Sequence, residues 1–190
     1  MEQPQKIYFT DRILLKTILP FIPRSITPNQ VTALRFFLTP LVVALLVLDY
    51  YTIGIVVFFI TALTDAIDGA MARTRDQITD WGKLYDPVAD KLLVGSVMLT
   101  VMLGRLDVRL VAAVVALELF IIIMGLLKKR EGHIIQANVW GKIKMNLQCF
   151  ALGFLLLSMI TGGHWGSQVA TILFIFGLGF GIMSIVRYGI

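Results

Sequence analysis

The sequence predicts an all-α membrane protein with six transmembrane helices, preceded by an amphipathic helix at the membrane interface. Of its 190 residues, 57% are hydrophobic, and the mean hydropathy is +0.83, a composition typical of polytopic membrane proteins. Six apolar segments each approach the roughly 20 residues that a helix needs to cross a bilayer. The connections between them are short, so we expect one domain over residues 1–190. Within it, residues 1–28 form the cytoplasmic interfacial part and residues 29–187 form a six-helix bundle.

Residues 10–22 are expected to form the interfacial helix, because apolar and charged residues alternate there with helical spacing. Pro20 and Pro23 end this helix. Thr27 then offers an N-cap for the first span, with Pro28 at the first helical position. The apolar face comprises Ile13, Leu14, Ile18 and Leu19, and the face expected to stay in water comprises Asp11, Arg12 and Lys16.

Six spans follow, at residues 29–49, 52–74, 82–104, 108–127, 139–161 and 167–187. If the N-terminus is cytoplasmic, all of the 17 Lys and Arg residues except Arg105 and Arg109 lie on or near the cytoplasmic side. This bias satisfies the positive-inside rule. We therefore expect an integral protein of a bacterial or archaeal cytoplasmic membrane, with its active site on the cytoplasmic side.

Several site classes are excluded by composition. The net charge of +5 is spread between hydrophobic segments, which favours membrane orientation and phosphate binding over a nucleic-acid partner. Cys149 is the single cysteine, and His133 and His164 lie in different predicted loops, so neither a disulfide nor a Cys- or His-based zinc site is expected. The polar start of the chain argues against a signal peptide.

Four aspartates at the edge of the bilayer are the strongest functional signal. Asp65 and Asp68 lie on one face of the second span, and Asp86 and Asp90 lie on one face of the third, by their spacing of three and four residues. Antiparallel neighbours would bring the two pairs together. Four carboxylates there need a counter-charge, and all-oxygen ligation suits magnesium, manganese or calcium. Magnesium commonly binds carboxylates together with substrate phosphates, so a diphosphate substrate is expected.

The residues around the aspartates fit such a substrate. Gly69, Ala72 and Gly82 leave room against the helix backbones, and Arg73 can pair with a phosphate. An ion or proton transporter also uses carboxylates within its spans, but it does not need these small residues at these spacings. A prenyltransferase that binds an isoprenyl diphosphate through magnesium is a further alternative, although its aspartate motifs are spaced differently.

The whole pattern resembles the signature of the CDP-alcohol phosphotransferase (CDP-alcohol phosphatidyltransferase) family, D-x2-D-G-x2-A-R-x8-G-x3-D-x3-D. A second stretch resembles the P-N-x2-T-x2-R run that opens the first span in many members. The signature is matched at every position, by Asp65, Asp68, Gly69, Ala72, Arg73, Gly82, Asp86 and Asp90, and the second run by Pro28, Asn29, Thr32 and Arg35.

This resemblance implies transfer of a phosphatidyl-type group from a CDP-linked lipid to an alcohol, with release of CMP. It implies two Mg²⁺ or Mn²⁺ ions and a homodimer. Asp65, Asp68 and Asp86 would be metal ligands, and Asp90 would be the general base that also touches a metal. The CDP pocket would be lined by Asn29, Thr32, Asp68, Gly69, Ala72, Arg73 and Gly82.

The acceptor is expected to carry its own phosphate. Lys142 and Lys144, followed by Gln148, resemble the G-K-x-K-T-x2-Q run of phosphatidylglycerophosphate synthases, with Met145 where Thr is usual. The D-P-V-A-D-K stretch from Asp86 also resembles that branch. We therefore expect sn-glycerol 3-phosphate as acceptor, with both lysines facing this acidic ligand rather than a structural carboxylate. As an alternative, the lysines are topology signals that snorkel to the interface.

One departure keeps other acceptors open. That branch usually has an R-E pair in the fourth span, where this chain has Leu117 and Glu118. Arg130 or Lys129 would have to replace the missing arginine in the acceptor site. Inositol phosphate, phosphatidylglycerol and an archaeal ether-lipid donor therefore remain alternatives within the same chemistry. Glu118 can also be a packing partner for a buried lysine.

Overall fold

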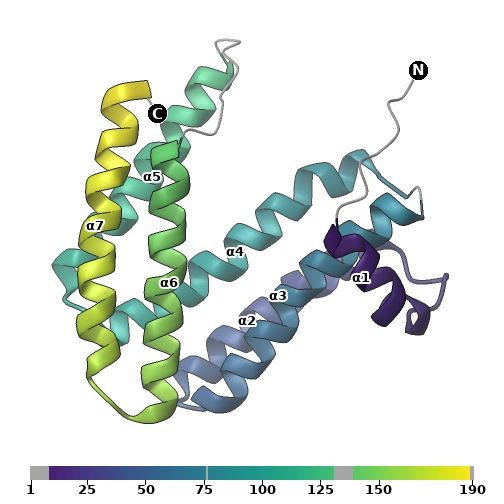
Figure 1. Ribbon diagram of the computed structural model, residues 1–190, viewed down its shortest axis with the longest axis horizontal. Helices are drawn as coiled ribbons and strands as arrows, with labels where there is room; N and C mark the ends of the chain where they lie inside the picture. Colours follow the sequence, from purple (N-terminus) through teal and green to yellow (C-terminus); the bar gives the residue numbers. More distant parts are fainter. Residues whose placement is uncertain (1–8, 76, 131–138, 189–190) are drawn as a thin grey trace. The chain divides into compact units, whose positions relative to one another are not determined.

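The computed structural model describes residues 9–75, 77–130 and 139–188, and in this part of the chain the secondary structure is helical (Figure 1). The all-α prediction is therefore confirmed. The elements are α1 (Phe9–Thr17), the short 3-10 helix η1 (Leu19–Phe21), α2 (Pro28–Val47), α3 (Tyr51–Thr74), α4 (Asp80–Arg105), α5 (Val108–Arg130), α6 (Val139–Thr161) and α7 (Trp165–Tyr188).

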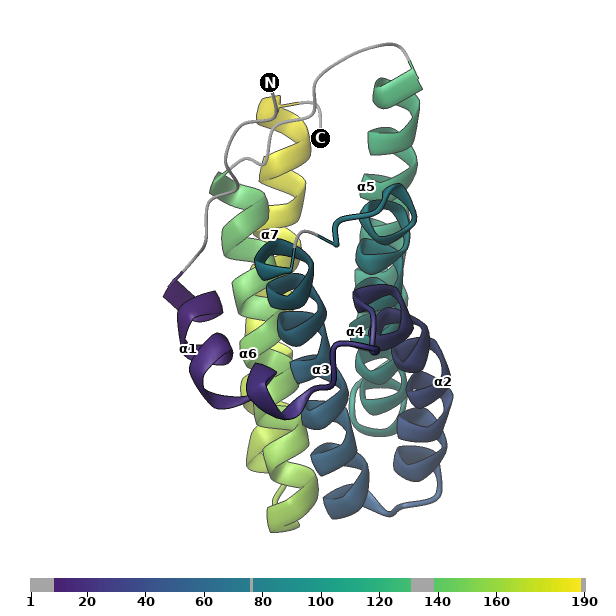
Figure 2. The same ribbon diagram turned by 90° about the vertical axis from the view of Figure 1, so that its right-hand side faces the viewer.

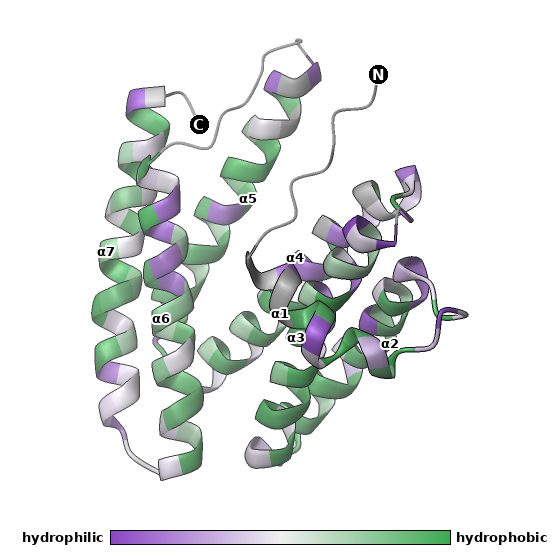
Figure 3. Ribbon diagram, turned by 45° about the vertical axis from the view of Figure 1, so that its right-hand side comes forward, coloured by the Kyte–Doolittle hydropathy of each residue, from purple (hydrophilic) through white to green (hydrophobic). Residues whose placement is uncertain are grey.

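Six of these helices, α2 to α7, are long and apolar enough to cross a membrane, and their ends lie within a few residues of the predicted spans. Figure 3 shows that hydrophobic residues cover most of α2, α3 and α7. Large apolar side chains also point outward: Phe37 and Val186 are each 78% exposed. Such a surface is unsuited to water but suited to lipid. The chain is thus an integral membrane protein.

The start of α2 is fixed by local hydrogen bonds, as predicted for Thr27 and Pro28. The Gln30 backbone N–H donates to Thr27 Oγ1 at 3.3 Å, and the Thr27 N–H donates to Gln30 Oε1 at 2.9 Å. This reciprocal pair is a capping box, and Pro28 occupies the first turn, where no intrahelical donor is needed.

The interfacial helix is shorter than predicted. Instead of one helix over residues 10–22, α1 ends at Thr17 and η1 follows. Pro20 explains the break, because its ring would clash with the carbonyl of Lys16 in a continuous α-helix. The side chains of Arg12, Ile13 and Lys129, and the whole of His133, lie outside the described residues.

The chain forms two compact units, residues 1–97 and 98–190, with α4 contributing to both. In the first unit, α2 and α3 pack along each other and α1 packs against α3 (Figure 2). In the second, α6 and α7 pack side by side and α5 packs on α7. The assignment of residues 1–190 to one domain stays a prediction.

An apolar cluster holds α1 and η1 against the end of α3. Leu14 and Leu19 are buried against Ala70 and Met71. This contact places the interfacial segment beside the same turns of α3 that carry the aspartate motif, so the fold positions it to shape the candidate site.

Candidate active site

Two side chains of α2 organise the aspartates of the motif. The fully buried Arg35 donates through Nη1 to Asp65 Oδ1 at 2.8 Å and through Nη2 to Asp68 Oδ2 at 2.6 Å. One turn earlier, the Thr32 hydroxyl lies 3.0 Å from Asp68 Oδ2 and 2.7 Å from Asp86 Oδ1. A hydroxyl has one proton, so it can donate to only one of these carboxylates at a time. Helices α2, α3 and α4 are thereby joined through one polar cluster.

Three of the four predicted aspartates therefore come together, and the fourth lies close by. Asp90 is one helical turn after Asp86 on α4, is exposed, and lies within electrostatic reach of Asp65 and Arg35. Asp65 is about half exposed and Asp68 is buried. The site thus has a closed side around Asp68 and an open side at Asp65 and Asp90.

The donor set fits a divalent cation in its chemistry, since carboxylate oxygens are the ligands that magnesium and manganese prefer. Among the described residues, however, no three acidic, histidine or cysteine side chains converge tightly enough to enclose an ion. The Arg35 guanidinium provides the positive charge that Asp65 and Asp68 need. A bound cation would therefore share these two carboxylates with Arg35.

Arg73, predicted to bind phosphate, has a carboxylate partner. Its Nε and Nη2 donate to Asp11 Oδ2 and Oδ1 of α1 at 2.9 and 2.7 Å. The prediction that Asp11 stays in water is wrong, because this residue is buried under the ion pair. A Cβ on Gly69 would lie 3.2 Å from Arg73 Nη1, so a larger residue there would require the Arg73 guanidinium to shift slightly. Ala72, the other predicted small residue on α3, is partly exposed.

Gly82 and Asn29 meet where α2 and α4 begin. A Cβ on Gly82 would lie 3.3 Å from Asn29 Oδ1 and 3.5 Å from Asp86 Oδ2. The Thr79 hydroxyl donates to Asn29 Oδ1 at 2.9 Å and accepts from the Gly82 N–H at 3.0 Å. A pocket of about 310 Å³, lined in part by Thr27, Asn29 and Thr79, lies at this point.

Sequence reasoning missed Thr79, although a threonine just before an apolar helix is an N-cap signal that could have found it. It also gave no role to Arg35, which it quoted only as part of a motif. The partner of Arg35 could not be found from sequence, because the ion pairs join residues about 30 positions apart.

The predicted acceptor residues lie in the second unit. Lys144 is buried, and its Nζ donates to Glu118 Oε1 at 2.6 Å, while Gln148 Nε2 donates to the same oxygen at 2.8 Å. The prediction that Lys144 faces a ligand rather than a structural carboxylate is therefore wrong, and Glu118 is the packing partner of a buried lysine. Lys142 is exposed, because residues two apart point to different sides of a helix. Arg130 is exposed at the end of α5.

Comparison with known proteins identifies the family to which the chain belongs. Residues 25–183 match the model of the CDP-alcohol phosphatidyltransferase family. The chain belongs to this family. It is thus a membrane-bound transferase of phospholipid synthesis, whose substrates are a CDP-linked lipid and an alcohol acceptor.

Individual relatives carry more specific names. The chain is 29% identical over 148 residues to the CDP-diacylglycerol--glycerol-3-phosphate 3-phosphatidyltransferase of Bacillus subtilis, covering 68% of this chain and 76% of the relative. It is 33% identical over 174 residues to the Pseudomonas fluorescens protein of the same name, covering 85% and 87%. It is 32% identical over 140 residues to a probable phosphatidylglycerophosphate synthase of Mycobacterium tuberculosis, covering 69% and 66%.

Proposed function

We propose that this enzyme transfers the phosphatidyl group of CDP-diacylglycerol to sn-glycerol 3-phosphate, forming phosphatidylglycerophosphate and CMP. In this reaction an acceptor hydroxyl oxygen forms a bond to the phosphatidyl phosphorus, and the bond from that phosphorus to the CMP oxygen breaks. The observation that carries the proposal is the polar cluster of Arg35, Thr32 and three motif aspartates, within a chain whose relatives are named for this reaction.

Two Mg²⁺ or Mn²⁺ ions would be held by Asp65, Asp68, Asp86 and Asp90. When bound, they neutralise charge on the diphosphate and on the departing CMP. Arg35 keeps the carboxylates of Asp65 and Asp68 at fixed positions through one hydrogen bond to each. Asp90 accepts the proton of the acceptor hydroxyl, a role supported by its exposure, which leaves its carboxylate open to a soluble alcohol.

The nucleotide end of the donor is assigned to the pocket beside Gly82. Asn29 and Thr79 line this pocket and offer polar groups, and the lack of a side chain at Gly82 lets Asn29, Thr79 and Asp86 approach its backbone closely. Arg73 contributes positive charge from α3 while Asp11 fixes its guanidinium. Thr32, Gly69 and Ala72 complete the set proposed to line the donor site.

The acceptor phosphate is assigned to Lys142 and Arg130. Lys142 and Arg130 are exposed and can meet a ligand directly. Lys144 is not assigned to the acceptor, because its Nζ donates to Glu118 Oε1 in a buried ion pair. We further propose that the protein is a homodimer in a bacterial or archaeal cytoplasmic membrane, with its active site facing the cytoplasm.

The test is CMP release by the purified protein with CDP-diacylglycerol and a panel of acceptors: glycerol 3-phosphate, inositol phosphate, inositol, serine and phosphatidylglycerol. We expect release with glycerol 3-phosphate to exceed that with every other acceptor. Faster release with inositol phosphate would retain the reaction class and overturn the acceptor. No release with any acceptor would overturn the proposed reaction.

A further inference from the structure

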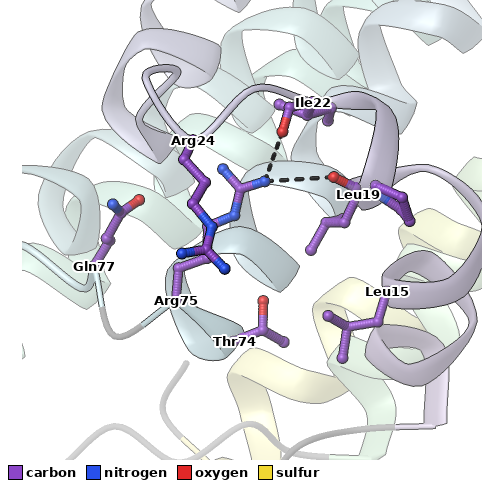
Figure 4. A pocket seen from close by; sticks show the side chains of 8 residues that line it. Leu15, Leu19, Ile22, Arg24, Thr74, Arg75 and Gln77 are labelled. Atoms are coloured by element: carbon purple, nitrogen blue, oxygen red, sulfur yellow. Dashed lines mark hydrogen bonds between the residues drawn. The ribbon is translucent and has the colours of Figure 1, made fainter.

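A second cavity, which shares Gln77 with the pocket at Asn29, lies where η1 and the following loop meet the end of α3 (Figure 4). Its volume is about 620 Å³. One part of its lining is apolar and another part is cationic or polar. The lining residues are Leu15, Leu19, Pro20, Ile22, Arg24, Thr74, Arg75 and Gln77.

Arg75 builds the wall of this cavity. Its Nη2 donates to the carbonyl oxygens of Ile22 at 2.9 Å and Leu19 at 3.4 Å, and its Nη1 lies 3.4 Å from the carbonyl oxygens of Pro23 and Ile26. Figure 4 shows the guanidinium turned toward the first two carbonyls. The loop is thereby held in a fixed shape, so the cavity is a built feature of the fold.

Arg24 and Gln77 have unused hydrogen-bonding capacity in this cavity. Arg24 is exposed and makes no hydrogen bond or ion pair with the described residues. The Gln77 Oε1 atom is buried, and within the same part of the chain it has no hydrogen-bond donor. An orphaned buried acceptor is costly. A ligand that offers a negative charge to Arg24 and a hydrogen-bond donor to Gln77 would satisfy both groups.

The position of the cavity indicates where such a ligand comes from. Thr74 is the last residue of the span α3, and Pro28, shortly after Arg24, is the first residue of the span α2. The cavity is therefore level with the membrane surface, where phospholipid headgroups lie. Leu15 and Leu19 supply an apolar wall for the upper part of an acyl chain.

We propose that this cavity binds an anionic phospholipid whose headgroup carries a free hydroxyl, with the phosphate on Arg24 and the hydroxyl donating to Gln77 Oε1. The chemistry selects among lipids. Phosphatidylglycerol supplies both the net negative charge and the donor, whereas phosphatidylcholine is zwitterionic and its headgroup has no hydrogen-bond donor. The proposal does not depend on the reaction proposed above. Gln77 also lines the pocket assigned to the donor nucleotide, whereas Arg24 lines only the present cavity of the two.

Native mass spectrometry of the detergent-purified full chain with added lipid tests the proposal, because it reads binding and not activity. We expect phosphatidylglycerol to bind about tenfold or more tightly than phosphatidylcholine. Arg24→Gln should weaken phosphatidylglycerol by about 10- to 100-fold, the range for one charge-assisted hydrogen bond. Gln77→Leu should reduce the affinity for phosphatidylglycerol and leave that for phosphatidylcholine unchanged.

Lys16→Gln is the matched control, because Lys16 is an exposed cation of α1 that does not line the cavity. Equal affinities for the two lipids, or equal losses in the Lys16 and Arg24 variants, would overturn the proposal. Free glycerol 3-phosphate and inorganic phosphate are added as competitors. If either displaces phosphatidylglycerol at a similar concentration, the site belongs to a soluble phosphate compound and the lipid assignment is wrong.

Discussion

Replacing Arg35 with glutamine should destabilise the metal-free protein strongly. Arg35 is fully buried and neutralises two carboxylates through bonds of 2.8 and 2.6 Å. The Asp68 side chain is only 2% exposed, so the variant leaves a buried charge without its cation, and breaking such a pair costs about 3–5 kcal/mol. Asp65 is 46% exposed, and water screens most of its contribution. The expected loss therefore comes almost wholly from Asp68.

The assay is the free energy of unfolding in mixed detergent micelles, followed by circular dichroism, in chelator and again in excess Mg²⁺. Arg35→Gln should lose about 3–5 kcal/mol in chelator, and Mg²⁺ should restore more stability to this variant than to the wild type. Arg109→Gln, at an exposed arginine of α5, is the control and should change stability by no more than about 0.5 kcal/mol. An Arg35 variant as stable as this control in chelator would refute the reasoning.

Three further predictions concern the metal, the base and the lysines. A chelator should abolish CMP release and Mn²⁺ or Mg²⁺ should restore it; full release in chelator would contradict the metal assignment. Asp90→Asn should retain nucleotide binding in a calorimetric titration but lose turnover, whereas Asp65→Asn should weaken metal and CDP-lipid binding together; near wild-type turnover by the Asp90 variant would remove its role as base. Lys142→Gln should raise the acceptor KM and leave the CDP-lipid KM and the stability unchanged, whereas Lys144→Gln should destabilise the protein, because Glu118 loses its ion pair. An unchanged acceptor KM in the Lys142 variant would make this lysine a topology signal.

The spans could be predicted from sequence because length and hydropathy alone determine which segments can cross a bilayer. The N-cap at Thr27 was predictable for a similar reason, since the capping signal is local in sequence. The break after Thr17 could also have been predicted, because the ring of Pro20 clashes with the carbonyl four residues earlier in a continuous helix.

The burial of Asp11 could not be predicted, and the sequence suggested a buried lysine beside Glu118 without identifying it as Lys144, because both pairings depend on distant partners. Asp11 pairs with Arg73, 62 positions away, and Lys144 pairs with Glu118, 26 positions away. An amphipathic pattern places every charged residue on the solvent-facing side of the helix. Only the packing of one helix on another shows which charged side chains are buried in ion pairs. The residues of the aspartate motif were found because their spacing is itself the signal, whereas the position of Arg35 between them required the register of α2 against α3.

The central claim is transfer of a phosphatidyl group to glycerol 3-phosphate, and identification of the lipid product tests it most directly. The purified protein is given CDP-diacylglycerol, Mg²⁺ and ¹³C-labelled glycerol 3-phosphate, and both products are quantified by mass spectrometry. The account predicts labelled phosphatidylglycerophosphate and CMP in equimolar amounts, with neither formed by Asp90→Asn. CMP without a labelled lipid, or a labelled lipid formed equally well by the Asp90 variant, would contradict it.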